Sequence, residues 1–227
     1  SLKVVIRGIV MYIIIVGLGG IGRNLVYLAT QNRHNVVVID KNPDRCRDIA
    51  GKYDVITLVG DATTRSVLEE AGIDRADSLI TTTSDDAANL MTVLVASDLG
   101  VKNIVSVVND QDHTDMFKRA GVNVQENPDL AVAQQLYWAM QRPRNIKDVI
   151  RIGDGKAEIF EVAVTNMSAV VGKELSQLSL QGEGLVVAIE RGDKIIVPRG
   201  DTKILAGDKV TIFAQSRFVN KMVSMFA

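Results

Sequence analysis

Short apolar runs alternate with amphipathic segments through the first 140 residues of the chain. In the segments between the runs, apolar residues recur at helical spacing, as Ile21, Leu25 and Leu28 do. Strands that are apolar on both faces and separated by helices are typical of βαβ units. We therefore predict an α/β fold, a Rossmann-like doubly wound parallel sheet. Its expected strands are Tyr12–Val16, Asn35–Ile39, Val55–Val59, Ser78–Thr82, Asn103–Val108 and Asn123–Gln125.

A last helix of this region is predicted to begin at Pro128, with Asn127 as its cap. Its apolar positions form a stripe that allows two interpretations. The helix faces the core of its own domain, or it crosses to a partner subunit, and the pattern favours neither. The stripe consists of Leu130, Ala133, Tyr137 and Met140.

The pattern changes after the polar segment Gln141–Asp148, which is typical of a linker. Beyond it we expect a second, smaller α+β domain with helices near Lys173–Leu180 and Ser216–Met225. The predicted organisation is a leader of unknown origin at 1–10, a nucleotide-binding domain at 11–141, a linker at 142–150 and the α+β domain at 151–227. The expected strands of the second domain are Ala157–Val164, Leu185–Glu190, Lys194–Val197 and Lys209–Phe213.

Charge and cysteine content narrow the function classes. The chain has 26 basic and 27 acidic residues, and no cluster of Lys and Arg residues forms a local basic patch. These features argue against nucleic-acid binding. The single cysteine, Cys46, excludes an internal disulfide framework and fits a reducing cytoplasm. No apolar run approaches the roughly 20 residues that span a bilayer, and the leader Ser1–Val10 is too short for a signal peptide.

A glycine turn follows the first predicted strand and opens a helix. Gly17, Gly19 and Gly22 satisfy the G-x-G-x-x-G spacing. In such a turn the first glycine permits the sharp bend, the second admits a pyrophosphate and the third lets helix and strand pack closely. The free N–H groups at the helix start attract phosphates. We therefore expect the backbone of the whole turn to hold the phosphates of a dinucleotide: Gly17, Leu18, Gly19, Gly20, Ile21 and Gly22.

Two carboxylates are expected at the same edge of the sheet. Asp40 ends the second strand, where a carboxylate accepts hydrogen bonds from both ribose hydroxyls of an adenosine, and it is followed by Lys41. Its charge also repels a 2′-phosphate, which argues against NADP. Asp61, followed by Ala62, ends the third strand and is placed to accept from the adenine amino group, although a turn or cap role is the alternative.

Hydroxyl groups mark the end of the fourth strand. Thr81, Thr82 and Thr83 are candidates for contacts with the second half of a dinucleotide. Asp85 and Asp86, which follow, are interpreted as residues that complement the dipole of the next helix.

No catalytic set and no metal site is predicted. His34 lies in a polar turn away from the nucleotide edge, and His113 is interpreted as a solvated residue at a helix start. Metal-ligand spacing of His and Cys is absent. The acidic cluster of Asp110 and Asp112 beside Asn109 is interpreted as helix capping.

Several segments together resemble the RCK (also KTN) family, the cytosolic regulators of potassium channels and of Trk/Ktr-type potassium transporters. The resemblance covers nearly the whole chain from Met11. It is carried by IIIVGLGGIG, Asp40 and GDATTRSVLEEAGIDRADSLITTTSDDAANL in the first domain, then by FKRAGVNVQENPDLAVAQQL, and by SAVVGKELSQL, VVAIERGDKIIVPRGDT and LAGDKVTIFA in the second.

The resemblance implies a gating subunit without catalysis, peripheral to the inner face of the membrane. It implies a homodimer that assembles into a ring, expected to be an octamer, beneath an integral-membrane potassium-translocating subunit. By position, the glycine turn would hold the phosphates, Asp40 the ribose and Asp61 the adenine, with Thr82 and Thr83 near the second nucleoside.

The chain departs from the family pattern at two places. ATP-binding relatives often have arginine where this chain has Gly20, which favours NAD or NADH over ATP or ADP, with nearby Arg23 as a substitute. The acidic residues of calcium-gated relatives are replaced by Thr82, Val107 and Asn109. The alternative functions are an NAD-dependent oxidoreductase and an RCK regulator of another cation channel or antiporter.

Overall fold

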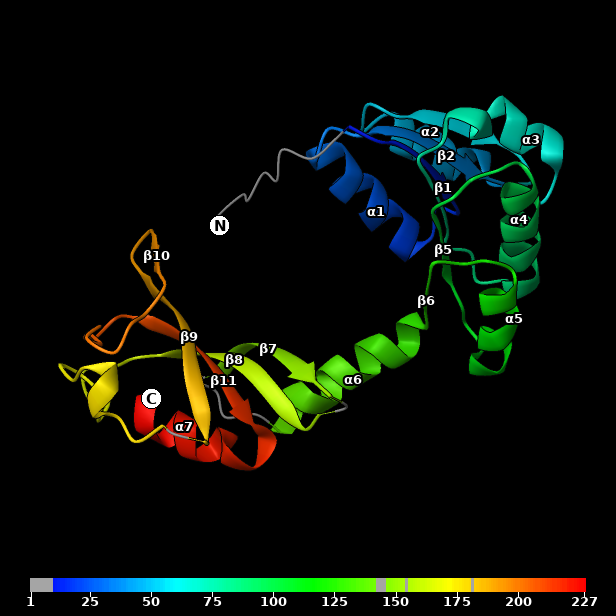
Figure 1. The fold of residues 1–227 in the computed structure, drawn as a ribbon. Coiled ribbons are helices and arrows are strands. Elements are labelled where there is room, and N and C mark those ends of the chain that lie inside the picture. The colour runs from blue at the N-terminus through cyan, green and yellow to red at the C-terminus, as the bar shows by residue number, and fades with distance from the viewer. Residues whose placement is uncertain (1–9, 142–145, 154, 181) are drawn as a thin grey trace. The chain divides into compact units, whose positions relative to one another are not determined.

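Six parallel strands form the sheet of the first part of the chain, in the order β3-β2-β1-β4-β5-β6. The computed structural model describes residues 10–141, 146–153, 155–180 and 182–227 (Figure 1). The chain divides between Tyr137 and Trp138 into two compact units. The strands of the first unit are β1 (Tyr12–Val16), β2 (Asn35–Asp40), β3 (Ile56–Val59), β4 (Ser78–Thr81), β5 (Ile104–Val107) and β6 (Val124–Glu126).

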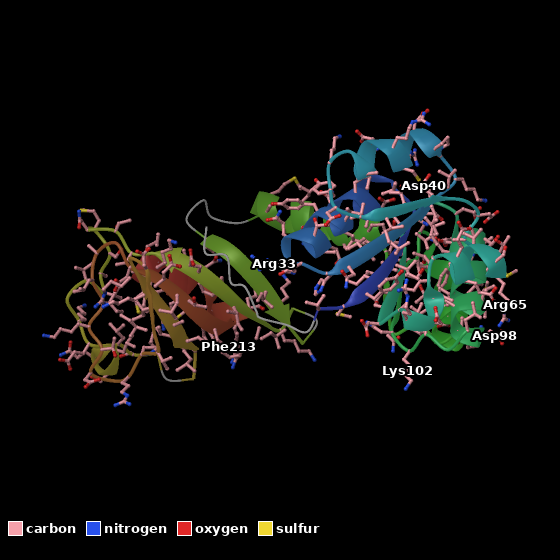
Figure 2. The ribbon with its side chains drawn as sticks, turned by 90° about the horizontal axis from the view of Figure 1, so that it is seen from above. Arg33, Asp40, Arg65, Asp98, Lys102 and Phe213 are labelled. Carbon is pink, nitrogen blue, oxygen red and sulfur yellow. The ribbon has the colours of Figure 1, made fainter. Side chains whose placement is uncertain are left out.

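Helices connect these strands, as the alternating pattern predicts. Each is short except α1, α4 and α6, and two single 3₁₀ turns, Ile73–Arg75 and Gln111–His113, complete the connections. Figure 2 shows Arg65 of α3 beside Asp98 of α4, where their side chains form an ion pair of 2.9 Å. The helices are α1 (Gly20–Gln31), α2 (Pro43–Ala50), α3 (Arg65–Glu70), α4 (Asp86–Asp98), α5 (Thr114–Arg119) and α6 (Pro128–Gln141).

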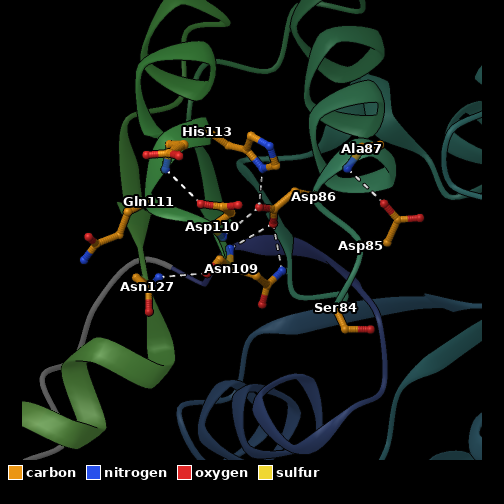
Figure 3. A pocket seen from close by; sticks show the side chains of 10 residues that line it. Ser84, Asp85, Asp86, Ala87, Asn109, Asp110, Gln111, His113 and Asn127 are labelled. Atoms are coloured by element: carbon orange, nitrogen blue, oxygen red, sulfur yellow. Dashed lines mark hydrogen bonds and ion pairs between the residues drawn. The ribbon is translucent and has the colours of Figure 1, made fainter.

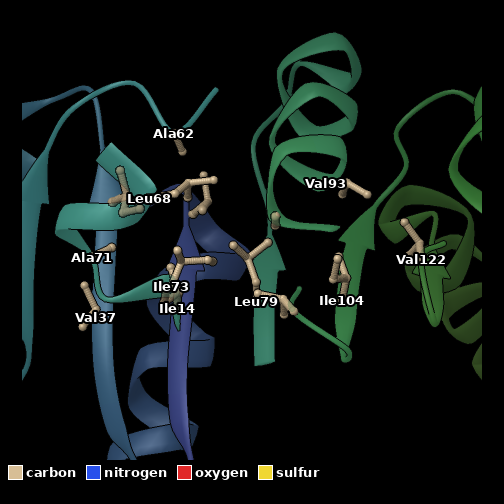
Figure 4. Packing of buried hydrophobic residues seen from close by; sticks show 14 of the residues in the cluster. Ile14, Val37, Ala62, Leu68, Ala71, Ile73, Leu79, Val93, Ile104 and Val122 are labelled. Atoms are coloured by element: carbon tan, nitrogen blue, oxygen red, sulfur yellow. The ribbon is translucent and has the colours of Figure 1, made fainter. Parts of the chain in front are cut away.

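The sheet is buried on both faces, which explains the nearly continuous apolar runs. In β1, Ile14 belongs to one core cluster and Ile15 to the other, and both are fully buried. Figure 4 shows the first cluster, where Leu79 and Ile104 of neighbouring strands pack near Val93 of α4. This layered packing confirms the predicted Rossmann-like fold.

The strand order reverses beside β1. β2 lies on one side of β1 and β4 on the other, so the connections leave in opposite directions at the carboxyl ends of β1 and β4. In open parallel sheets, ligands bind in the crevice outside this switch point. The predicted site residues therefore come from the edge of the sheet where such a crevice is expected.

The second unit is a five-stranded antiparallel sheet of order β10-β9-β11-β8-β7, covered by α7 (Val219–Phe226). Phe160 and Ile212 from the sheet and Phe226 from α7 are buried together in its core. This confirms the predicted α+β fold. Its strands are β7 (Ile146–Ile152), β8 (Ala157–Ala163), β9 (Gly184–Arg191), β10 (Lys194–Ile196) and β11 (Lys209–Gln215).

A bidentate ion pair supports the end of this sheet. The Arg191 guanidinium donates from Nε and Nη2 to the two carboxylate oxygens of Asp208, at 2.8 and 2.9 Å. Burial of Asp208 alone would raise its pKa, but the bonds from Arg191 and from Leu205 N outweigh burial and lower the pKa. The pair therefore fixes the turn that leads into β11.

Two secondary-structure predictions for this region are wrong. Strand β7 begins at Ile146, inside the predicted linker. The pattern does not reveal this strand because apolar and polar residues do not alternate strictly across the register shift between Lys147 and Ile150. The segment Lys173–Leu180 forms only the 3₁₀ turn Leu175–Gln177, not a helix. There Glu174 bridges to Lys203, which holds the chain extended at that point. Residues 142–145 of the linker and 1–9 of the leader lie outside the described residues.

In the described ranges, no helix is long and apolar enough to cross a membrane.

Candidate functional site

The glycine turn between β1 and α1 needs glycine at two of its positions. Gly17 has a φ of +95°, in the left-handed region that favours glycine. At Gly22, an added Cβ would lie 1.8 Å from the carbonyl oxygen of Gly17. Helix and strand therefore meet as closely as the motif requires.

The outer side of the same turn is open. A Cβ added at Gly19 or Gly20 would meet no atom within 4 Å. In the part of the chain that the structure describes, no side chain caps α1, so its first N–H groups are open to water or a ligand. These groups and the positive end of the helix dipole suit an anion.

Asp40 holds this turn from the side of β2. Its Oδ2 accepts from Leu18 N at 2.5 Å, and its Oδ1 accepts from Asn42 N at 2.8 Å. The residue is 8% exposed. Each carboxylate oxygen retains a lone pair, so the group can still accept a ribose hydroxyl while it anchors the turn.

Thr82 holds the turn from the side of β4. Its hydroxyl donates toward the carbonyl oxygens of Val16 and Gly17, both at 3.0 Å, and is nearly buried. Thr83 Oγ1 contacts Asn89 Oδ1 at 2.7 Å and Asp85 O at 3.1 Å. Thr81 Oγ1 bonds Ser106 Oγ at 2.7 Å. The three hydroxyls thus have internal partners, and the ligand contacts predicted for Thr82 and Thr83 stay predictions.

A cleft of about 800 Å³ opens between these elements at the switch point. The part of the turn from Gly17 to Ile21 lines it, as do Asp40, Lys41, Asp61, Ala62, Thr82 and Thr83, whereas Gly22 lies behind the turn against Gly17. The structure also brings into the cleft residues that no sequence pattern marked as site residues: Arg45, Ala88, Thr92, Pro128, Asp129 and Val132.

Lys41 and Asp61 form an ion pair within the cleft. Lys41 Nζ lies 2.9 Å from Asp61 Oδ2, while Asp61 Oδ1 accepts from the N–H and hydroxyl of Thr63. The hydrogen bond from Lys41, then those from Thr63, lower the pKa of Asp61. Asp61 is therefore an ionised acceptor with one lone pair of Oδ2 left for a ligand donor.

The arginine that lines the cleft is Arg45, not Arg23, the predicted substitute for the missing arginine at position 20. Arg23 Nε bonds Leu18 O at 3.1 Å and its Nη1 bonds Asp48 at 2.9 Å, and Arg23 does not line the cleft. Arg45, on the first turn of α2, lines it and has Nη1 3.9 Å from Asp40 Oδ2. Among the described residues, Arg45 is therefore the arginine that lies beside Asp40, the candidate ribose acceptor.

A second, open pocket adjoins the cleft and contains His113 (Figure 3). His113 lies at the start of α5, as predicted, and its side chain is 42% exposed, but its Nδ1 also lies 2.8 Å from Asp86 Oδ2, a contact that the sequence pattern does not predict. This hydrogen bond raises the pKa of His113. Burial raises the pKa of Asp86, but the N–H groups of Asn109 and Asp110 outweigh it, and the net shift is downward.

The remaining reactive groups lie in structural positions. His34 Nδ1 accepts from Met11 N at 3.2 Å, and Cys46 is buried under α2, where burial raises the pKa of its thiol. Within the described ranges, no group of three His, Cys, Asp or Glu residues is arranged to hold a metal ion.

The fold and the cleft define a two-domain chain whose first unit has the architecture of dinucleotide-binding proteins. The TrkA-N domain family matches residues 13–128, and the TrkA-C domain family matches residues 159–227. The chain therefore belongs to the TrkA family, which confirms the resemblance inferred from its motifs.

Relatives of known name extend this assignment. The Trk system potassium uptake protein TrkA homolog of Methanothermobacter thermautotrophicus is 30% identical over 216 residues, which are 95% of this chain and 99% of that protein. The homolog of Archaeoglobus fulgidus is 32% identical over 220 residues, 95% of this chain and 50% of that protein. The chain thus aligns with nearly the full length of the first relative and with half the length of the second.

Solved structures share the fold. The GsuK channel bound to NAD has a TM-score of 0.64 at 18% identity, over 96% of this chain and 40% of that one. The TrkA-N domain of the inner membrane protein ybaL from Escherichia coli has a TM-score of 0.54 at 19% identity, over 58% and 98%. These similarities establish the architecture alone.

Proposed function

We propose that this chain is a cytoplasmic regulatory subunit of a potassium uptake transporter or channel, and that binding of an adenine nucleotide to its first domain, residues 11–141, controls it. The relative matched throughout is named a potassium uptake protein, and GsuK is described as a channel bound to NAD. The observation that carries the nucleotide proposal is the Asp40–Leu18 bond, because it brings the carboxylate proposed to accept the ribose hydroxyls beside the open glycine turn.

NAD or NADH is the proposed ligand, with ATP or ADP as the alternative. The cleft has two acidic acceptors, Asp40 and Asp61, on its adenosine side and the open turn beside them. We expect a diphosphate rather than a triphosphate at the turn, because no arginine stands at Gly20 to reach a terminal phosphate and Arg23, the possible substitute, is bonded to Asp48. Among solved structures with this fold, the Kef C-terminal domain of Shewanella denitrificans is described in an AMP-bound form.

Regulation without chemistry is the proposed mode of action. The His113 ring bonds Asp86 in the adjoining pocket, and neither histidine is among the residues that line the cleft. A ligand shifts a conformational equilibrium only through unequal affinity for the two states. In this proposal nucleotide occupancy biases the conformation of an assembly that contacts an integral-membrane potassium-translocating subunit.

The proposed assembly is a homodimer that forms a ring. Apolar side chains of the predicted stripe on α6 are exposed in the single chain: Leu130 is 41% exposed, Tyr137 50% and Met140 77%. These exposures favour the interpretation in which α6 packs against a second copy. A lone apolar residue on a surface is ordinary, but a run along one helix indicates an interaction site.

The test combines binding, mass and turnover. Calorimetry with NADH, NAD, ATP and ADP on the full chain should give binding, and Asp40→Ala should abolish it. Native mass spectrometry should detect an oligomer and any nucleotide retained after purification. Failure of all four ligands to bind would overturn the proposal, and reduction of NAD in the presence of small alcohols or hydroxy acids would favour the oxidoreductase instead.

A further inference from the structure

The first turn of α6 is one wall of the nucleotide cleft. Pro128, Asp129 and Val132 line the same cleft as the glycine turn. Asn127 caps this helix, because its Oδ1 accepts from Leu130 N at 2.8 Å and its carbonyl oxygen accepts from Ala131 N at 3.0 Å. A ligand in the cleft therefore lies beside the start of the helix that leads out of the first unit.

The cap is tied to the cleft by a second bond. The Nδ2 of Asn127 donates to Asn109 O at 2.9 Å, as Figure 3 shows. Asn109 follows β5 and lines both the cleft and the adjoining pocket. One side chain, Asn127, thus satisfies the helix end with its oxygen and holds the β5 turn with its nitrogen.

Asn109 is in turn fixed from two other elements. Its Nδ2 lies 3.1 Å from Thr83 O, at the end of β4, and 2.8 Å from Asp86 Oδ1, at the start of α4. Its backbone N–H donates to the same Asp86 oxygen at 2.9 Å. Asn109 therefore contacts three elements that surround one half of the cleft.

The carboxylate at the centre of this network has no spare acceptor capacity. Asp86 Oδ1 accepts both bonds from Asn109, and Oδ2 accepts from Asp110 N at 2.9 Å and faces His113 Nδ1. Four donors occupy its four lone-pair positions. Because each bond is directional, a displacement of Thr83 or Asn109 moves the cap of α6 or breaks a bond of the network.

We propose that Asn109 is a positioning residue for the nucleotide site and that its bond to Asn127 couples occupancy of the cleft to the first turns of α6. This inference rests on the proposed function, since it needs a nucleotide in the cleft. The coupling is reciprocal: what holds the start of α6 also sets the position of the cleft wall and the affinity for the ligand.

The decisive variant separates the two roles of Asn127. Asn127→Asp keeps an oxygen for Leu130 N but removes the donor to Asn109 O. Asn123→Asp is the matched control, because Asn123 Oδ1 also accepts a backbone N–H, from Ile104 at 2.7 Å, and lies at the opposite end of β5. Both variants gain one negative charge, so their difference reports the lost donor.

Two measurements on the full chain give the readout: NADH affinity by calorimetry, and amide hydrogen exchange of residues 128–137 with and without NADH. In the wild-type chain, NADH should slow exchange there by about fivefold or more. Asn123→Asp should change affinity by no more than about twofold and keep the slowing. Asn127→Asp should bind NADH more weakly than the wild type and lose the slowing even at saturating NADH, and Asn109→Ala should lose both affinity and slowing.

The outcomes separate this inference from the function on which it rests. Slowing of exchange in Asn127→Asp equal to that of the wild type, at saturating NADH, overturns the coupling and leaves the nucleotide site intact. If the wild type binds NADH without any change in residues 128–137, the coupling is also wrong. If the wild type binds neither NADH nor ATP, the proposed function itself fails.

Discussion

Asp40 at the end of β2 and Leu18 in the glycine turn are joined by a hydrogen bond of 2.5 Å from Leu18 N to Asp40 Oδ2. One carboxylate thus fixes the turn that we propose binds the phosphates, and the same group is the proposed acceptor for the ribose. The two halves of the candidate site are therefore a single hydrogen-bonded unit, and a change at Asp40 affects both.

This relationship predicts the effect of Asp40→Asn. The amide keeps one oxygen for Leu18 N but loses the negative charge that, in the proposed site, strengthens the hydrogen bonds from the ribose hydroxyls. The affinity for NADH should therefore fall by about 10-fold to 100-fold. Discrimination against NADPH should also shrink, because the repulsion of a 2′-phosphate is gone. Calorimetry measures both. Asp44→Asn, an exposed residue of α2 paired with Arg47, serves as the control and should leave both values unchanged.

Asp61 is predicted to select the base. In the proposed site, its free lone pair would accept from the 6-amino group of adenine and repel the 6-oxo group of hypoxanthine. The wild type should therefore bind ATP more tightly than ITP, and Asp61→Ala should reduce that preference by about fivefold, the worth of one hydrogen bond. Competition against a fluorescent nucleotide gives the ratio. An unchanged ratio in the variant would remove Asp61 from the base site.

The contact at Gly22 predicts a loss of stability. Gly22→Ala places a methyl group 1.8 Å from Gly17 O, and the forced separation of helix and strand should cost about 1–3 kcal/mol. Gly20→Ala, in open space on the same helix, should change the free energy of unfolding by less than about 0.5 kcal/mol. Urea denaturation distinguishes them, and equal effects would contradict the close approach.

The His113–Asp86 contact predicts a pH dependence of stability. The pKa of His113 is raised above its ordinary value of 6.5, mainly by the bond to Asp86. Its contribution is therefore fully present below that ordinary value and is lost as the pH rises through the raised pKa. His113→Gln should lack this slope in urea denaturation measured from about pH 6 to pH 8.5. An identical slope in variant and wild type would assign it to other groups.

The ion pair between Arg191 and the buried Asp208 predicts a loss of stability in the second unit when Asp208 is replaced. Asp208→Asn keeps an oxygen for Leu205 N but leaves Arg191 without its charge partner, which should lower the free energy of unfolding by about 2–3 kcal/mol. The pKa of Asp208 is lowered in the folded chain. The stability that the ion pair contributes is therefore present at pH values above the ordinary pKa of an aspartate and is lost as the pH falls through the lowered pKa. Asp193→Asn, in the β9–β10 turn, is the control.

Prediction from the sequence failed where tertiary contacts override local pattern. Ile146 begins β7, although the segment around it has the composition of a linker. The pattern does not predict the strand because its apolar residues do not alternate across the register shift. The segment around Leu175 has helical spacing, yet the bridge between Glu174 and Lys203 keeps the chain extended there. Neither the shift nor the bridge has a signature in a single sequence.

The amino-acid sequence by itself determined the Rossmann-like order of elements, the glycine turn and the acidic residue at the end of β2, because strand periodicity and turn chemistry are local properties. Only the tertiary structure decided which side chains share the cleft and how each is engaged. It placed Arg45 in the cleft and removed Arg23, and it joined Asn109 to Asn127 and Asp86. The physical reason is that hydrogen-bond partners depend on distances between elements far apart in the chain, which local pattern does not encode.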